Sequence, residues 1–136
     1  RVDEALKFVK ESECDWLSVA VGSVHGAIAD NLLDKKKPAA KLDVERIGEL
    51  REALNIPLVL HGGSGTGDEN LARATREGIA KVNIFTDLSL AAVAALEEKG
   101  LPENMGVMQA VETLRNGYKD KLIHYMKLFN MENKAW

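Results

Sequence analysis

PLVLHGGSGTG, residues 57–67, sets the architecture of this chain, because an apolar run ends directly in a glycine-rich segment. The short apolar run is typical of a buried parallel strand, which is covered on both faces. Asp68 is predicted to cap a helix that extends through Glu77 and is closed by Gly78. A strand that leads through glycines into a helix indicates a βαβ unit, so we expect an α/β fold with a parallel sheet.

The same alternation of helix and strand continues on both sides of this stretch. The predicted elements are a helix over 2–12, a strand over 16–21, a long loop over 22–41, a helix capped by Asp43 through Leu54, a strand over 79–84, a helix from Thr86 or Asp87 to about Lys99, a break at Gly100 and Pro102, and a final helix over about 106–128. Three parallel strands with both faces covered cannot close a barrel. We therefore expect residues 1–136 to be the C-terminal part of a single (β/α)8 TIM-barrel domain, about three βα units plus terminal helices, whose N-terminal strands are missing from this chain.

Composition excludes several classes of protein. Eighteen Lys and Arg against 21 Asp and Glu give a net charge of -3, which argues against a nucleic-acid partner. The longest apolar run, residues 88–96, is too short to span a bilayer, so no membrane partner is expected. The single cysteine, Cys14, fits a reducing, cytoplasmic setting. The chain opens at Arg1 within a helical pattern, so we expect it to be a piece of a longer protein.

The residues with chemical potential follow the predicted strands. They form the segments GSVHG at 22–26, HGGSG at 61–65 and NIFTD at 83–87. The carboxyl ends of barrel strands converge on one face, and glycines let backbone N–H groups approach an anion there. Ser64, Asn83 and Thr86 could donate to the same anion, which predicts a phosphate site. A pair of tight turns with no ligand stays open as the alternative.

Histidines follow two of these strands at equivalent positions. His25 and His61 each precede a glycine, and imidazole is a common neutral ligand of zinc. Aimed at a phosphate cradle, this pair favours a metal site over two hydrogen-bonded structural histidines, which is the other interpretation. The third histidine, His124, falls within the final helix and is interpreted as packed or solvated.

Three segments of the chain, VAVGSVHG at 19–26, PLVLHGGSG at 57–65 and KVNIFTD at 81–87, resemble the C-terminal signatures of the class II, zinc-dependent ketose-bisphosphate aldolases. That family includes fructose- and tagatose-bisphosphate aldolases. The resemblance spans residues 2–128 and covers the back half of the family's barrel. It implies a cytoplasmic lyase of glycolysis and carbohydrate metabolism, which reversibly cleaves a ketose 1,6-bisphosphate to dihydroxyacetone phosphate and glyceraldehyde 3-phosphate.

The resemblance also implies roles for individual residues. His25 and His61 would bind Zn²⁺, which acts as a Lewis acid on the ketone, and a monovalent cation would lie near the phosphate. The substrate-binding residues would be Gly26, Gly62, Gly63 and Ser64 around the phosphate of dihydroxyacetone phosphate, with Asn83, Ile84, Phe85 and Thr86 closing the site. No catalytic acid or base is expected in this chain, because the family's Asp-x-His motif lies on an earlier strand. Lys81 would be a strand residue, although a Schiff-base role stays open.

The expected partners are a phosphorylated ketose, the N-terminal part of the same barrel and further copies in a dimer or tetramer. The final helix carries an apolar stripe for the barrel or a second subunit, formed by Val107, Ala110, Val111, Leu114 and Leu122. The lysines 35–37 are interpreted as part of a solvated loop or as a lid for a second phosphate, and Gly106 falls where some family members place an arginine for it. Two other functions stay open: a phosphate-binding half-barrel without catalysis, and a related class II aldolase for another phosphorylated ketose.

Overall fold

The structure is a computed structural model and describes residues 1–23, 41–100, 102 and 105–134. His25, Gly26 and lysines 35–37 lie outside the described residues, and so do most of the predicted loop and its proposed lid. The chain divides into two compact units, Arg1–Ile84 and Phe85–Trp136, and each is described by itself.

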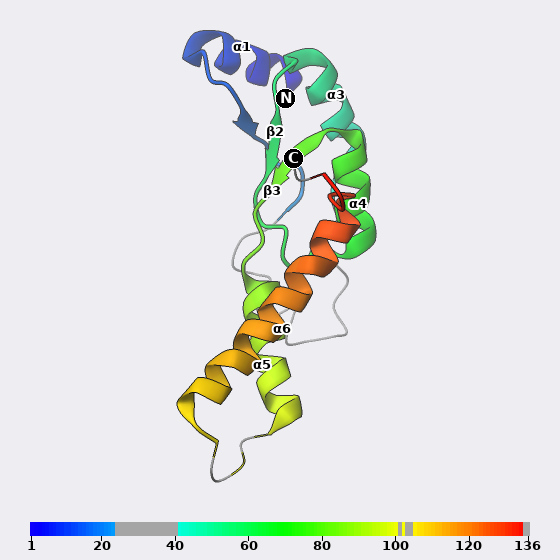
Figure 1. The fold of residues 1–136 in the computed structure, drawn as a ribbon. Helices are drawn as coiled ribbons and strands as arrows, with labels where there is room; N and C mark the ends of the chain where they lie inside the picture. Colours follow the sequence, from blue (N-terminus) through cyan, green and yellow to red (C-terminus); the bar gives the residue numbers. More distant parts are fainter. Residues whose placement is uncertain (24–40, 101, 103–104, 135–136) are drawn as a thin grey trace. The chain divides into compact units, whose positions relative to one another are not determined.

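A parallel sheet forms the centre of the first unit. Its described strands are β1 (Leu17–Ser18), β2 (Leu58–Leu60) and β3 (Ile79–Val82), in the order β1-β2-β3, as Figure 1 shows for β2 and β3. All pairs are parallel, which confirms the expected βαβ topology. The strands are shorter than predicted, and the register shifts between Leu58 and Val59 where β2 meets β3. Backbone bonds still continue past the regular ladder, from Val19 N to Val59 O and from Asn83 N to Leu60 O.

Three helices accompany this sheet: α1 (Val2–Ser12), α3 (Val44–Leu54) and α4 (Asp68–Glu77). Asp43 caps α3 as predicted, since its carboxylate accepts from the backbone N–H of Arg46 at 3.0 Å. The predicted cap of α4 was wrong by one residue, because Gly67 is the N-cap and Asp68 is already helical. Gly67 has a φ of 87°, a conformation that glycine adopts at little cost, and so the loop enters the helix one residue earlier.

The core of the first unit lies between β2 and the helices α3 and α4, which lie side by side on the same side of the strands (Figure 1). Right-handed crossovers are the usual hand of βαβ units, and two of them in the same direction put both helices on one face of a sheet. The buried side chains are Ile47, Leu50 and Leu54 of α3, Leu71 and Ala74 of α4, and Leu58 and Leu60 of β2. Burying each large aliphatic side chain stabilises the unit by roughly 1.5–3 kcal/mol. Ser18 of β1 and Lys81 of β3 are both register partners of Val59 in β2, and both are exposed.

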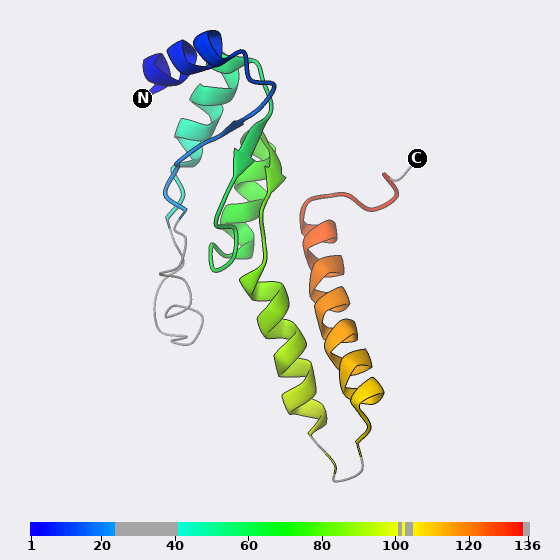
Figure 2. The same ribbon diagram turned by 90° about the vertical axis from the view of Figure 1, so that its left-hand side faces the viewer.

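The second unit is an antiparallel pair of helices, α5 (Thr86–Lys99) and α6 (Val107–Leu128), seen from the side in Figure 2. Both were predicted, and Gly100 ends α5 with a φ of 75°. A Cβ atom on Gly117 would lie 2.7 Å from the carbonyl oxygen of Ala91, so glycine allows the two helices to touch. The ends are joined by Lys99 Nζ donating to Thr113 Oγ1 and by Tyr125 Oη donating to Asp87. Within the described part of the chain, no helix is long and apolar enough to cross a membrane.

Candidate functional site

The carboxyl ends of β2 and β3 lie together, as predicted for a shared site. His61 follows β2 directly, and Asn83 follows β3 directly. Two backbone bonds hold the strand ends in register, from Asn83 N to Leu60 O at 2.9 Å and from Gly63 N to Asn83 O at 3.0 Å. These bonds clamp the backbone of Asn83 between β2 and the glycine-rich loop.

Three side chains form a polar chain across these strand ends. The Lys81 Nζ ammonium donates to Asn83 Oδ1 at 2.6 Å, and Asn83 Nδ2 lies 3.1 Å from His61 Nε2. The register pairs Val59 with Lys81 and Leu60 with Val82, so His61 and Asn83 occupy the next pair along the two strands. Because alternate residues of a strand share a face, Lys81 and Asn83 point to the same side of β3. The imidazole, the amide and the ammonium are all accessible to solvent or to a ligand.

The loop after His61 owes its shape to glycine. Gly62 and Gly65 have φ angles of 68° and 74°, which side chains with a Cβ rarely adopt. Gly63 meets a different constraint, since an added Cβ would lie 2.6 Å from the Val82 side chain and 3.0 Å from Asn83 O. Gly62, Gly63 and Ser64 are buried against the strands. The loop is therefore folded tightly against the end of β3, in a form that suits close approach of its backbone to a small anion.

Thr66 is a residue of this loop that sequence reasoning missed. Its side chain is fully buried, and its hydroxyl donates to Gly62 O at 3.1 Å. Its backbone N–H donates to Gly63 O at 3.2 Å, while Asn70 Nδ2 donates to Thr66 O at 3.1 Å. Thr66 thus closes the loop on itself and ties it to α4. A hydroxyl residue between two glycines was the available signal, because such a side chain commonly satisfies turn carbonyls.

The other predicted site residues are distributed over both units. The Ile84 side chain contributes to the wall against Gly63 in the first unit. Phe85 is the N-cap of α5 and is 73% exposed, and Thr86 is the first residue of that helix, so both belong to the second unit. Their participation in one site with the loop stays a prediction. His124 is exposed in α6, with its ring edge-on to Tyr125 at 5.4 Å, in line with a partly solvated side chain.

The described residues offer one imidazole for a metal at the strand ends. Among residues 1–23, 41–100, 102 and 105–134, no group of three or more His, Cys, Asp or Glu side chains could hold a metal ion. His61 nevertheless fits the chemistry of zinc, because it is an exposed nitrogen ligand beside further polar donors. The assignment of His25 as its companion falls on a residue outside the described ranges.

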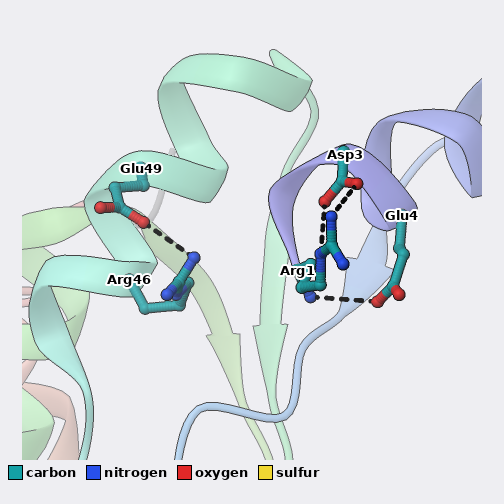
Figure 3. Close-up of polar contacts among 5 residues, drawn as sticks. All are labelled: Arg1, Asp3, Glu4, Arg46 and Glu49. Atoms are coloured by element: carbon teal, nitrogen blue, oxygen red, sulfur yellow. Dashed lines mark hydrogen bonds and ion pairs between the residues drawn. The ribbon is translucent and has the colours of Figure 1, made fainter.

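A separate hollow of about 650 Å³ lies between α1, β1 and α3. Arg1 and Arg46 both line it, but their guanidinium groups are paired with carboxylates of the same helices (Figure 3). Arg1 contacts Asp3 at 2.8 Å, and Arg46 contacts Glu49 at 3.0 Å. These pairs neutralise the charge that an anion would need, so we place the candidate site at the ends of β2 and β3.

Comparison with protein families gives a match over residues 1–134 to the model described as fructose-bisphosphate aldolase class II. Among curated proteins, the chain is 34% identical over 133 residues to YdjI of Escherichia coli K12. It is also 34% identical over 136 residues to a sulfofructosephosphate aldolase of Alkalicoccus urumqiensis. These alignments cover 98% of this chain and 44% of each relative, so the chain spans less than half the length of those relatives.

Solved structures show the same partial coverage. The crystal structure of the YdjI aldolase from Escherichia coli K12 superposes with a TM-score of 0.80 at 32% identity, over the whole of this chain and 46% of that one. A candidate fructose-1,6-bisphosphate aldolase from Coccidioides immitis gives a TM-score of 0.78 at 26% identity, over 98% of this chain and 44% of that one. The α/β fold with its parallel sheet is thus the fold of one portion of these longer aldolase chains, consistent with the expected partial TIM barrel.

Proposed function

The chain belongs to the class II fructose-bisphosphate aldolase family, and on that premise we propose that it is the C-terminal portion of a zinc-dependent aldolase. The proposed reaction is the reversible cleavage of a ketose 1,6-bisphosphate, from fructose or tagatose, to dihydroxyacetone phosphate and glyceraldehyde 3-phosphate. One observation of the structure supports it most: the contact of His61 with Asn83 at the ends of adjacent strands, beside a tightly folded glycine loop. The acid-base carboxylate is assigned to the part of the barrel outside this chain.

In this proposal zinc, when bound, supplies Lewis-acid polarisation of the substrate ketone. His61 and His25 would hold it. The backbone N–H of Gly62 and the hydroxyl of Ser64 would bind the phosphate, with the proposed monovalent cation beside it, while Gly63, whose N–H donates to Asn83 O, would shape the loop around it. The first turn of α4 already carries Asp68 and Glu69, whose charges complement the helix dipole, so the loop itself is the better anion site.

The test uses the purified protein that carries this sequence, loaded with zinc and assayed for formation of dihydroxyacetone phosphate. We expect a chelator to abolish cleavage and added zinc to restore it. His61→Ala should lower kcat/KM by at least about 100-fold, because it removes a metal ligand. His124→Ala is the matched control and should leave activity unchanged. Phosphate binding without cleavage, equally strong after chelation, would instead support the half-barrel without catalysis.

Two observations support a second candidate substrate. A relative at 34% identity is named sulfofructosephosphate aldolase, and Gly106, the N-cap of α6, has no side chain to hold a second phosphate. The assay panel therefore includes fructose 1,6-bisphosphate, tagatose 1,6-bisphosphate and a sulfofructose phosphate. The largest kcat/KM identifies the substrate. A preference for the sulfonated ketose would replace the bisphosphate assignment while keeping the aldolase reaction.

We also propose that the protein acts in the cytoplasm, and that it forms a dimer or tetramer. Support for assembly comes from α6, where Val107 and Met108 are 78% and 79% exposed and Val111 is 50% exposed. Apolar side chains that are this exposed on one helix commonly become covered when a protein assembles. Sedimentation velocity over a range of concentrations tests this. A monomer at every concentration would contradict it.

A further inference from the structure

The sheet of the first unit has two faces, and α3 and α4 cover the first of them. Leu58 and Leu60 of β2 point toward these helices and are fully buried. Val59 lies between them in the strand, so its side chain points to the second face, because successive residues of a strand alternate. Ser18 and Lys81 are the register partners of Val59 and share this second face with it, where both are exposed.

A β-bulge in β3 turns Lys81 to the second face. Ile79 pairs with Leu58 and Lys81 pairs with Val59, so β3 takes two steps where β2 takes one, and Ala80 is the extra residue. In a regular strand Ile79 and Lys81 would point the same way. Ile79 is instead buried, with 4% of its surface exposed, while Lys81 is exposed. The bulge thus re-aims a charged side chain away from the core of the unit.

The ammonium of Lys81 is the only ionic group on the described strands. Its one hydrogen bond in the described part of the chain runs from Nζ to Oδ1 of Asn83 at 2.6 Å, and this acceptor is a neutral amide. None of the ion pairs formed among the described residues includes Lys81. An ammonium has three N–H donors, so two are available to further acceptors.

In the proposed aldolase, the second face is the inside of the barrel. The helices of a (β/α)8 barrel lie outside its strands, and the side chains on the other face fill its interior. The chain spans 44% to 46% of the aldolase structures that it matches, so the strands that close the proposed barrel belong to the part outside this chain. Closure removes water from around Lys81. Lysine is almost never fully buried unless it is paired, because a buried ammonium loses its hydration.

We propose that the rest of the barrel places an aspartate or glutamate carboxylate at ion-pair distance from Lys81 Nζ, one layer below His61 and Asn83. The inference rests on the proposed function and goes beyond it, because it names the chemistry by which the closing strands meet this face. The carboxylate accepts N–H groups that Asn83 does not use and balances their charge. A lysine paired in this way stays an ammonium, which has no lone pair with which to form a Schiff base.

The first test is a crystal structure of the full-length protein that carries this sequence, and it needs no substitution. We expect an Asp or Glu carboxylate oxygen from outside residues 1–136 within about 4 Å of Lys81 Nζ. An ammonium surrounded by water or by neutral acceptors only would overturn the inference. A carboxylate that comes from residues 1–136 would overturn it as well.

The second test measures whether the two charges depend on each other. Lys81→Met leaves the carboxylate buried without its counter-charge, and the amide variant of the carboxylate residue does the same to the ammonium. We expect each single variant to lower the folding equilibrium constant, measured by urea denaturation, by about 100-fold or more. The loss in the double variant should be at least about tenfold smaller than the product of the two single losses. Losses that multiply to within about twofold would overturn the inference.

Lys119→Met replaces an exposed lysine of α6 and is the matched control. It should change the folding equilibrium constant by less than about twofold, as is usual for surface substitutions. Should Lys81→Met fail to fold, recovery of folded protein in the double variant, which leaves neither charge unpaired, gives the same information. Absence of that recovery would contradict the ion pair.

Neither test uses aldolase turnover, so this inference and the proposed function can fail separately. An ion pair at Lys81 in a full-length protein that shows no zinc-dependent cleavage would overturn the proposed function and leave the inference standing. Zinc-dependent cleavage by a protein in which no carboxylate lies near Lys81 would overturn the inference alone.

Discussion

Gly63 in the loop after β2 and Gly117 in α6 both occupy places where an added Cβ would collide with neighbouring atoms. Gly63 lets a loop fold against the end of β3, 3.0 Å from the Asn83 carbonyl oxygen, beside the candidate site. Gly117 lets two helices approach each other in the second unit. The same steric requirement therefore shapes the loop at the candidate site in one unit and the packing of two helices in the other, and substitutions should separate these two effects.

Gly63→Ala should have the largest effect. The new methyl group would overlap the Val82 side chain of β3 and press on the carbonyl oxygen of Asn83, which is held in place by its hydrogen bonds to the loop and to β2. We expect the free energy of unfolding to fall by about 3 kcal/mol, as for severe overpacking. Urea denaturation measures the loss, and isothermal titration with inorganic phosphate should show weakened binding. Phosphate affinity equal to that of the wild type would contradict the proposed role of this loop.

Gly117→Ala should destabilise by about 2 kcal/mol, because overlap with Ala91 and Ala95 outweighs the better helix propensity of alanine. Phosphate binding should be retained, in contrast to Gly63→Ala. Gly106→Ala is a suitable control in the same unit, since nothing lies within 4 Å of its added Cβ. Equal stability of the two variants in urea would show that the helices do not pack as closely as described.

Tyr125→Phe should cost about 1.5 kcal/mol of unfolding free energy. The substitution removes the hydroxyl that donates to the Asp87 carboxylate at 2.5 Å, and hydrogen bonds to charged groups have about this strength. The aromatic packing of Tyr125 on Phe129 should persist, because the ring is retained. Thermal unfolding of the variant and the wild type measures the difference. A melting temperature unchanged from the wild type would show that this hydrogen bond does not stabilise the second unit.

Thr66→Val should have the smallest effect on stability, about 1 kcal/mol, because one neutral hydrogen bond to Gly62 O is lost while the volume is kept. Its effect on phosphate binding should exceed its effect on stability, since the hydroxyl closes the loop at the site. Thr75→Val, whose hydroxyl bonds to Ala72 O within α4, is the matched control. A larger loss of phosphate affinity in the control would show that Thr66 has no special part in the loop.

Much of the fold was predictable because it depends on patterns local to the sequence. Alternating helical and apolar segments predicted the helices and their order, and the prediction that Asp43 caps α3 is confirmed. The strand lengths depend on how the strands pair, and the N-cap of α4 depends on the φ angle of Gly67. Neither follows from residue type alone.

The candidate site was predicted in part. The positions of His61 and Asn83 after adjacent strands predicted that they meet, and they do. Lys81 was assigned no contact at the site, although its spacing from Asn83 places both on one side of β3. The hydrogen bond from the Thr66 hydroxyl to Gly62 O depends on how the glycines turn the loop, and residue types alone do not determine that turn. The metal assignment of His25 and the joint site with Phe85 and Thr86 stay predictions.

The charge of Lys81 has a further consequence for the behaviour of the chain in solution. In the described sheet, β1 and β3 are the outer strands, and outer strands offer unpaired backbone groups to other chains. β1 has only two residues in regular pairing, and β3 carries a lysine at its third position. A short strand and a strand that bears an ammonium group are both poor templates for fibril-like growth. In the proposed closed barrel these two outer strands would pair with strands outside this chain, so the same open edges mark where the rest of the domain would join.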